Sequence, residues 1–137
     1  MSFLLDTNVV SELRRGPSAN PSVVEWFDGQ SARELFLSVV IVGEIRQGIE
    51  QIRSRDGRQA AALDRWLKGL VQFYEDRVID VDGDVAEAWG RIRARRSAPV
   101  VDALIAATAS VHDLTVATRN ARDFEGLGVK VLNPWRV

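Results

Sequence analysis

Short apolar segments alternate with helical patterns along this chain, and this alternation is its strongest constraint on the fold. Each apolar segment is too short for a buried helix, and most contain the β-branched and aromatic residues that favour strands. Strands that alternate with helices predict an α/β fold in three layers, with a short, mostly parallel central sheet flanked by helices. The expected strands are residues 3–5, 35–39, 78–79, 114–118 and 129–132.

The segments between these strands carry apolar residues at the three- and four-residue spacing of helices that bury one face. Asp6 or Thr7 can cap the first helix, and Pro21 opens the second. No linker-like stretch, repeat or low-complexity tract interrupts the pattern, so we expect a single domain over residues 1–137. The expected helices are residues 8–15, 21–29, 40–54, 58–75, from Asp82 or Asp84 into the basic run 91–96, and 97–113, with a helical turn at 120–124.

The composition excludes several kinds of chemistry. The 137 residues include no cysteine and one histidine, His112, so disulfides, thiolate metal sites, a cysteine nucleophile and a histidine-rich metal site are excluded. A formal net charge of −1 does not argue against a nucleic-acid substrate, because local patches decide such binding. Neither a membrane-spanning run nor a secretory signal is evident, so we expect a cytoplasmic protein.

Four acidic side chains stand beside strongly apolar sequence: Asp6, Glu44, Asp102 and Asp123. Acidic residues are rarely buried unless they are paired or bind a metal. Taken singly, Asp6 could be a helix cap and Glu44 could face solvent, whereas Asp102 has core-type neighbours on its helix. Asp6 ends one expected strand, and the segment with Asp123 follows another. Functional groups gather at that end of parallel strands, so this placement indicates a site.

Carboxylates that converge on one cleft repel each other unless a cation lies among them. Mg²⁺, with Mn²⁺ as the alternative, binds oxygen ligands of this kind. Such a cluster is typical of metal-assisted phosphodiester hydrolysis, in which the metal activates a water and stabilises charge on the phosphate. The chain offers no other clear nucleophile or general base, so metal-activated water is the expected one.

Four segments in order, and the closing residues, form a recognisable set of motifs. They resemble the motifs of PIN-domain ribonucleases of the VapC toxin type, and the resemblance covers the whole chain. The resemblance implies the PIN-like version of the three-layer α/β architecture. The segments are Leu4-Leu5-Asp6-Thr7-Asn8-Val9-Val10-Ser11-Glu12-Leu13, Ser38-Val39-Val40-Ile41-Val42-Gly43-Glu44-Ile45-Arg46-Gln47-Gly48, Asp102-Ala103-Leu104-Ile105-Ala106-Ala107-Thr108-Ala109, Val116-Ala117-Thr118-Arg119-Asn120-Ala121-Arg122-Asp123-Phe124 and Asn133-Pro134-Trp135.

The resemblance implies a Mg²⁺-dependent endoribonuclease that is the toxin of a type II toxin–antitoxin pair. By it, Asp6, Glu44 and Asp102 are metal-site acids. Asn120 or Asp123 fills the fourth position; we favour Asp123, because a neutral amide is the weaker ligand, and keep Asn120 as a water-holding or supporting residue. Polar support for the carboxylates is expected from Thr7, Asn8 and Thr118, although each could equally make a local cap or turn bond.

The resemblance also implies partners. A small VapB-like antitoxin would lay a segment across the cleft and suppress cleavage, and the pair would bind DNA only through the antitoxin. A homodimer is implied as well. The interface is expected near Trp26, Ile49 and Trp66. The RNA target stays open among transfer, ribosomal and messenger RNA.

A basic run leads toward Asp102 and could hold RNA phosphates, although a solvated helix end is the alternative. Two other functions remain open. One is a catalytically weak PIN-like binding module. The other is a phosphoryl-transfer domain with Asp6 as nucleophile, which would need a second aspartate where Asn8 stands. The arginines of the run are Arg91, Arg93, Arg95 and Arg96.

Overall fold

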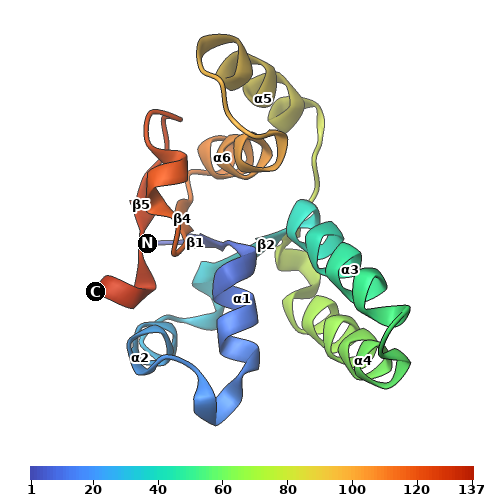
Figure 1. Ribbon diagram of the computed structural model, residues 1–137. Coiled ribbons are helices and arrows are strands. Elements are labelled where there is room, and N and C mark those ends of the chain that lie inside the picture. The colour runs from blue at the N-terminus through green and yellow to red at the C-terminus, as the bar shows by residue number, and fades with distance from the viewer.

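Five parallel strands form the sheet at the centre of the computed structural model, which describes residues 1–137 (Figure 1). All neighbouring strands pair in parallel, in the order β3-β2-β1-β4-β5. The expected α/β architecture is therefore confirmed, with each strand at its expected place or one or two residues shorter at an end. The strands are β1 (Phe3–Leu5), β2 (Leu35–Ser38), β3 (Val78–Ile79), β4 (Thr115–Ala117) and β5 (Val131–Leu132).

The order of the strands decides where a site can form. From β1 the chain winds outward through β2 to β3, and it later returns to add β4 and β5 on the other side of β1. Leu4 at the centre pairs with Phe36 on one side and Val116 on the other. The direction of winding thus reverses at β1. The carboxyl ends of β1, β2 and β4 meet at this edge, where parallel sheets usually bind their ligands.

Six α-helices surround the sheet. In Figure 1, α1 and α2 lie on one side of it, α5 and α6 on the other, and α3 with α4 forms a hairpin that extends away from the strands. Among the alternatives for helix starts, Asp6 caps α1 and Asp82 caps α5. The helices are α1 (Thr7–Arg14), α2 (Pro21–Asp28), α3 (Val39–Arg53), α4 (Gly57–Tyr74), α5 (Gly83–Arg95) and α6 (Val100–His112).

The apolar faces of the helices and strands meet in one core. Leu4 and Leu5 of β1, Leu37 of β2 and Val116 of β4 are fully buried, and Ile105 of α6 packs into the same cluster. Burying a side chain of this size stabilises the fold by roughly 1.5–3 kcal/mol before entropy is counted. This packing fixes the strand ends that carry the candidate site. None of the helices combines the length and the hydropathy that a membrane-spanning helix requires.

Candidate active site

Asp6 lies where β1 ends and α1 begins, and three hydrogen bonds orient its carboxylate. Oδ1 accepts the backbone N–H of Thr7 at 2.8 Å. Oδ2 accepts the hydroxyl of Thr118 at 2.8 Å and the side-chain amide of Asn8 at 3.4 Å. Burial raises the pKa of Asp6 above its ordinary value; the hydrogen bonds oppose this rise, and the charge of Asp123 adds to it. Asp6 is thus a fixed, strongly desolvated carboxylate.

Thr118 connects the ends of β1 and β4. Besides donating to Asp6, its hydroxyl oxygen accepts the Asn8 side-chain amide at 3.2 Å and the backbone N–H of Asn120 at 3.0 Å. Asn8 in turn accepts the backbone N–H of Arg119 at 3.1 Å through Oδ1. Asn8 and Thr118 therefore lie where supporting residues were expected. Asn120 joins the network through its backbone alone, and its exposed side chain has no hydrogen bond.

Glu44 approaches Asp6 from a different element. Ser38 ends β2 and caps α3 by accepting the N–H of Val40 at 3.0 Å, which places Glu44 in the second turn of that helix. One oxygen of Glu44 accepts the hydroxyl of Thr7 at 2.7 Å. Thr7 thus serves two acids, Asp6 through its backbone and Glu44 through its side chain.

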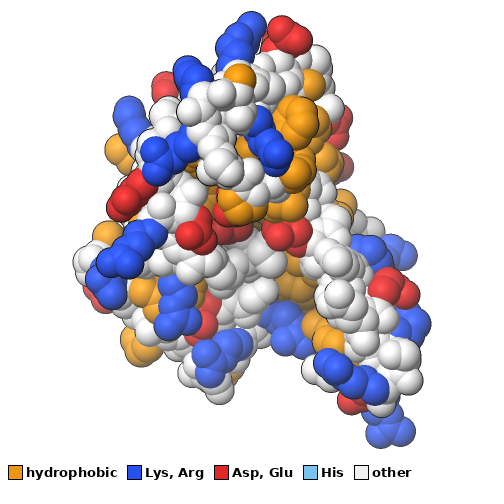
Figure 2. Space-filling model, turned by 45° about the horizontal axis from the view of Figure 1, so that its top comes forward, with side chains coloured by type: hydrophobic (Ala, Val, Ile, Leu, Met, Phe, Trp, Pro, Cys, Tyr) orange, Lys and Arg blue, Asp and Glu red, His pale blue; other side chains and the backbone are white.

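Asp102 and Asp123 complete the acidic cluster. Asp102 lies in the first turn of α6, and burial raises its pKa; the charges of Asp123, Asp6 and Glu44, in that order, raise it further. Asp123 lies on the short 3₁₀ helix η4 (Ala121–Phe124), whose Phe124 is 1% exposed and anchors the segment in the core. Acidic side chains gather near the middle of the face that Figure 2 shows. The structure therefore brings Asp6, Glu44 and Asp123 within electrostatic reach of Asp102.

The donor set of this cluster suits a hard divalent cation, because every side chain in it offers carboxylate oxygens. No lysine or arginine forms an ion pair with any of the four acids. No three acidic or histidine side chains are grouped closely enough to hold one ion by themselves. Mg²⁺ commonly takes one or two carboxylates and keeps several waters. The residues therefore fit a partly hydrated Mg²⁺ ion better than a dry, fully protein-bound one.

The four arginines of the basic run point to different places. Arg93 donates to the carbonyl of Ala98 at 3.2 Å and lies over the Trp89 ring at 5.6 Å. The guanidinium of Arg96 packs against Gly126. The remaining two, Arg91 and Arg95, line a separate cavity. None of the four forms an ion pair with a cluster acid, so the run is not a local counter-charge for the carboxylates.

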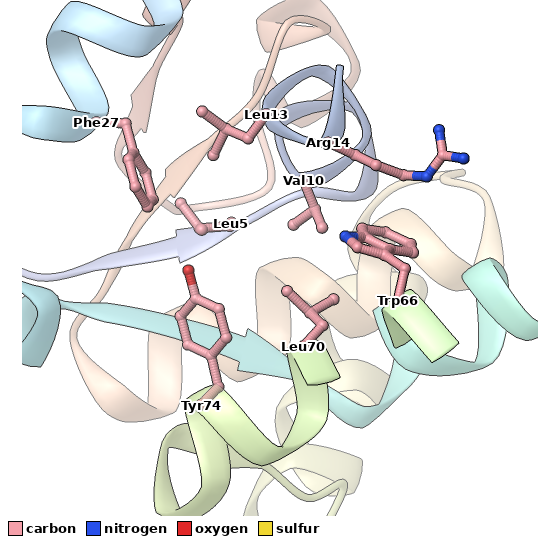
Figure 3. Close-up of a pocket in the computed structure, with 8 residues that line it drawn as sticks. All are labelled: Leu5, Val10, Leu13, Arg14, Phe27, Trp66, Leu70 and Tyr74. Atoms are coloured by element: carbon pink, nitrogen blue, oxygen red, sulfur yellow. The ribbon is translucent and has the colours of Figure 1, made fainter. Parts of the chain in front are cut away.

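A groove leads away from the acids between α1 and the α3–α4 hairpin. It has a volume of about 300 Å³ and extends from Thr7 and Glu44 to Arg14 and Trp66. The same Arg14 and Trp66 line a neighbouring, mostly apolar cavity of about 140 Å³ (Figure 3). The guanidinium of Arg14 lies 5.6 Å from the centre of the Trp66 ring, at the boundary between the two spaces.

Sequence reasoning missed part of this groove. Ser11 and Arg14 line it together with Thr7, and the three share one face of α1 at four- and seven-residue spacing, a signal that the sequence does contain. Of the expected interface residues, Ile49 and Trp66 line the groove. Trp26 does not, because it is buried edge-to-face against Phe3 with ring centroids 5.0 Å apart.

Comparison with protein families and known proteins gives a consistent result. The model of the PIN domain family matches residues 3–130. Plasmid stability protein StbB of Pseudomonas syringae pv. tomato is 38% identical, over 97% of this chain and 98% of its own. Toxin FitB of Neisseria gonorrhoeae is 36% identical over 97% and 98%. VapC ribonuclease Y4jK of Sinorhizobium fredii is 33% identical over 97% of each.

Solved structures agree in fold. The crystal structure of FitAcB from Neisseria gonorrhoeae superposes with a TM-score of 0.89 and 35% identity, covering 98% of this chain and 99% of that one. The structure of FitAB bound to a DNA fragment gives a TM-score of 0.87 and 33% identity, over 98% and 96%.

Proposed function

Because the chain belongs to the PIN-domain family, in its group of VapC-type ribonuclease toxins, we propose that it is a Mg²⁺-dependent endoribonuclease, with Mn²⁺ as the alternative ion. It acts as the toxin of a type II toxin–antitoxin pair, in the cytoplasm, where its RNA substrates are. The observation that carries this proposal is the cluster of four carboxylates without a paired cation. Such a cluster favours binding of a divalent ion, because the ion relieves its internal repulsion.

Each acid has its own part in the proposed site. Asp6, held by Thr118 and Thr7, is a preoriented ligand, because its carboxylate cannot turn without breaking short hydrogen bonds. Glu44, held by Thr7, is the second oriented acid. The carboxylates of Asp102 and Asp123 form no ion pair within the chain and accept none of its side-chain hydrogen bonds, so their oxygens are free for an ion or its waters. A bound Mg²⁺ would activate water and stabilise the charge that develops on the phosphate.

The fourth acidic position is proposed to be Asp123 and not Asn120. The charge of Asp123 acts on both Asp6 and Asp102. Asn120 contributes a backbone N–H to Thr118, and its neutral side chain is left to hold water at the rim. Asn8 acts indirectly, by donating to Asp6 and to Thr118.

The proposed protein partner is a VapB-like antitoxin that occupies the groove beside the acids. The groove begins at Glu44 and ends at Trp66, next to an apolar cavity, so it suits a segment with apolar side chains and one basic side chain. A basic group near Glu44 would inhibit by replacing the charge of the metal. DNA binding is proposed to occur only through the antitoxin, and the toxin itself is proposed to form a homodimer. A complex without a basic side chain near the acids would contradict this mode of inhibition.

Cleavage assays test the proposal directly. Structured RNA and tRNA are incubated with the purified protein in Mg²⁺, Mn²⁺ or chelator, and Asp6→Asn and Asp102→Asn are compared with wild type. Asp76→Asn is the control, since Asp76 is exposed and lies outside the cluster. We expect metal-dependent cleavage by wild type and Asp76→Asn alone. Cleavage that persists in chelator, or in both site variants, would overturn the metal mechanism. RNA bound without cleavage would favour a binding module, and phosphorylation of Asp6 independent of Glu44 would favour phosphoryl transfer.

A further inference from the structure

A cavity with two arginines lies between α5, α6 and the loop after η4. Its volume is about 210 Å³, and Arg91 and Arg95 line it together with Ser110 and Gly128. We propose that this cavity is a phosphate-binding site that holds a backbone phosphate of the RNA at a distance from the cleavage site. The inference rests on the proposed function, since it supplies a second contact for the same substrate.

The positive charge of this cavity has little compensation from acidic side chains. No acidic residue lines it, and the only ion pair of its two arginines joins Arg91 to Glu87 at 3.5 Å in an exposed contact. Arg95 has no ion pair or side-chain hydrogen bond within the chain. Arg93 and Arg96, in contrast, already contact Ala98 and Gly126. Of the basic run, Arg91 and Arg95 are therefore the two that line a common cavity, with Arg95 unpaired and Arg91 held by one long, exposed ion pair.

Neutral donors accompany the two cations. The exposed hydroxyl of Ser110 and the backbone of Gly128 belong to the same wall. Gly128 has a φ of 78°, and its N–H donates no hydrogen bond within the chain. Guanidinium groups bind phosphate oxygens in a bidentate manner, and hydroxyl and backbone N–H donors complete such sites. This combination of donors favours a phosphate over an apolar ligand.

The cavity shares two elements with the acidic cluster. The helix α6 carries Asp102 in its first turn and Ser110 near its end, which lie about 12 Å apart along the axis at 1.5 Å per residue. The loop with Gly128 follows η4, which carries Asp123. A single-stranded RNA with one phosphate at the acids would therefore bring a phosphate a few nucleotides further along the strand to Arg91 and Arg95.

The test measures binding separately from cleavage. Affinity of wild type and the double variant Arg91→Ala/Arg95→Ala for a single-stranded RNA oligomer is measured in chelator at several salt concentrations. We expect the double variant to bind roughly tenfold more weakly, the size of effect for lost charge-assisted hydrogen bonds. The slope of the logarithm of its binding constant against the logarithm of salt concentration should become shallower by about 0.7 for each lost phosphate contact. The matched control is Arg58→Ala/Arg65→Ala, which removes two exposed arginines of α4.

Further measurements distinguish RNA phosphate from inorganic phosphate, and distinguish failure of this site from failure of the proposed nuclease function. Arg91→Lys/Arg95→Lys should recover part of the affinity, and thermal unfolding checks that each variant is folded. Unchanged affinity and salt dependence in the folded Ala variant would overturn the inference. Inorganic phosphate that binds as tightly as the oligomer would overturn the RNA assignment. If the affinity effect is present but wild type cleaves no RNA in Mg²⁺, the proposed nuclease function fails while this site stands.

Discussion

The hydroxyl of Thr118 donates a 2.8 Å hydrogen bond to Asp6 across 112 residues of sequence. This bond joins the ends of β4 and β1, at the point where the sheet reverses its winding. The same hydroxyl oxygen accepts from Asn8 and from the backbone of Asn120. One buried side chain therefore ties together three segments of the acidic edge.

Thr118→Val should weaken both the fold and the site. Valine has the same shape, but it removes the acceptor of the Asn8 and Asn120 N–H groups and the shortest hydrogen bond to Asp6 Oδ2, a loss of about 1–3 kcal/mol where these groups are buried. The pKa of Asp6 should rise further, because the lost hydrogen bond lowers it. Cleavage should fall by roughly 10- to 100-fold, as for supporting residues of metal sites. Urea unfolding measures the stability, and RNA cleavage in Mg²⁺ measures the activity. Thr118→Ser keeps the hydroxyl and should retain most of both. An equal loss in the two variants would contradict this role of Thr118.

Asp102→Asn should stabilise the protein in chelator. Asp102 has no hydrogen bond to lose, and the change removes a charge that burial and three other carboxylates oppose. The gain should be roughly 0.5–1 kcal/mol after solvent screening. Thermal unfolding in chelator measures it, and the same variant should lose at least about 100-fold in Mg²⁺-dependent cleavage. A lower melting temperature for Asp102→Asn than for wild type would mean that the other carboxylates do not repel Asp102.

The pH dependence of stability should carry the same signature. The pKa values of Asp6 and Asp102 are raised above 3.8, so the folded state binds more protons than the unfolded state between 3.8 and the raised values. The contribution of these two carboxyl groups to the free energy of unfolding therefore falls as pH rises through that window. In chelator, the stability advantage of Asp102→Asn over wild type should grow from pH 4 to pH 7. Saturating Mg²⁺ should reduce the difference, and a difference that shrinks with pH in chelator would contradict the raised pKa.

Asp123 and Asn120 should differ in their effect on metal dependence. Asp123→Asn removes a charge that acts on Asp6 and Asp102, so the Mg²⁺ concentration for half-maximal cleavage should rise by about tenfold or more. Asn120→Ala keeps the backbone N–H that Thr118 accepts, so its effect should stay within about threefold. Titration of cleavage with Mg²⁺ compares the two. The reverse order would assign the fourth position to Asn120.

Phe124→Ala should show how firmly the core holds Asp123. Phe124 is fully buried, and truncation of such a side chain costs about 3–5 kcal/mol. Urea unfolding measures the loss of stability. The Mg²⁺ concentration for half-maximal cleavage by the folded protein should also rise, because η4 loses its anchor in the core. Phe124→Leu, which keeps most of the volume, should be milder in both respects. A loss below about 1 kcal/mol for the alanine variant would show that η4 is held by other contacts.

Local patterns in the sequence were sufficient for the strands and helices and for the acids as candidates. Alternation of strand and helix, proline at the start of α2 and the aspartate caps all act over a few residues, so periodicity and capping chemistry predict them. Trp26, expected near an interface, is buried in the core, and its helical spacing is the same as that of a surface anchor. Its burial depends on Phe3, which lies on a different element.

The sequence by itself determined which residues could form strands, helices and a carboxylate site, because those preferences lie in short-range periodicity and residue chemistry. Only the tertiary structure decided that Thr7 serves both Asp6 and Glu44, and that Arg91 and Arg95 share a cavity while Arg93 and Arg96 are engaged elsewhere. Such contacts depend on the order of the strands and on how the helices pack over them. At such contacts, segments far apart in the chain meet, and no local pattern encodes which distant residue a side chain will contact.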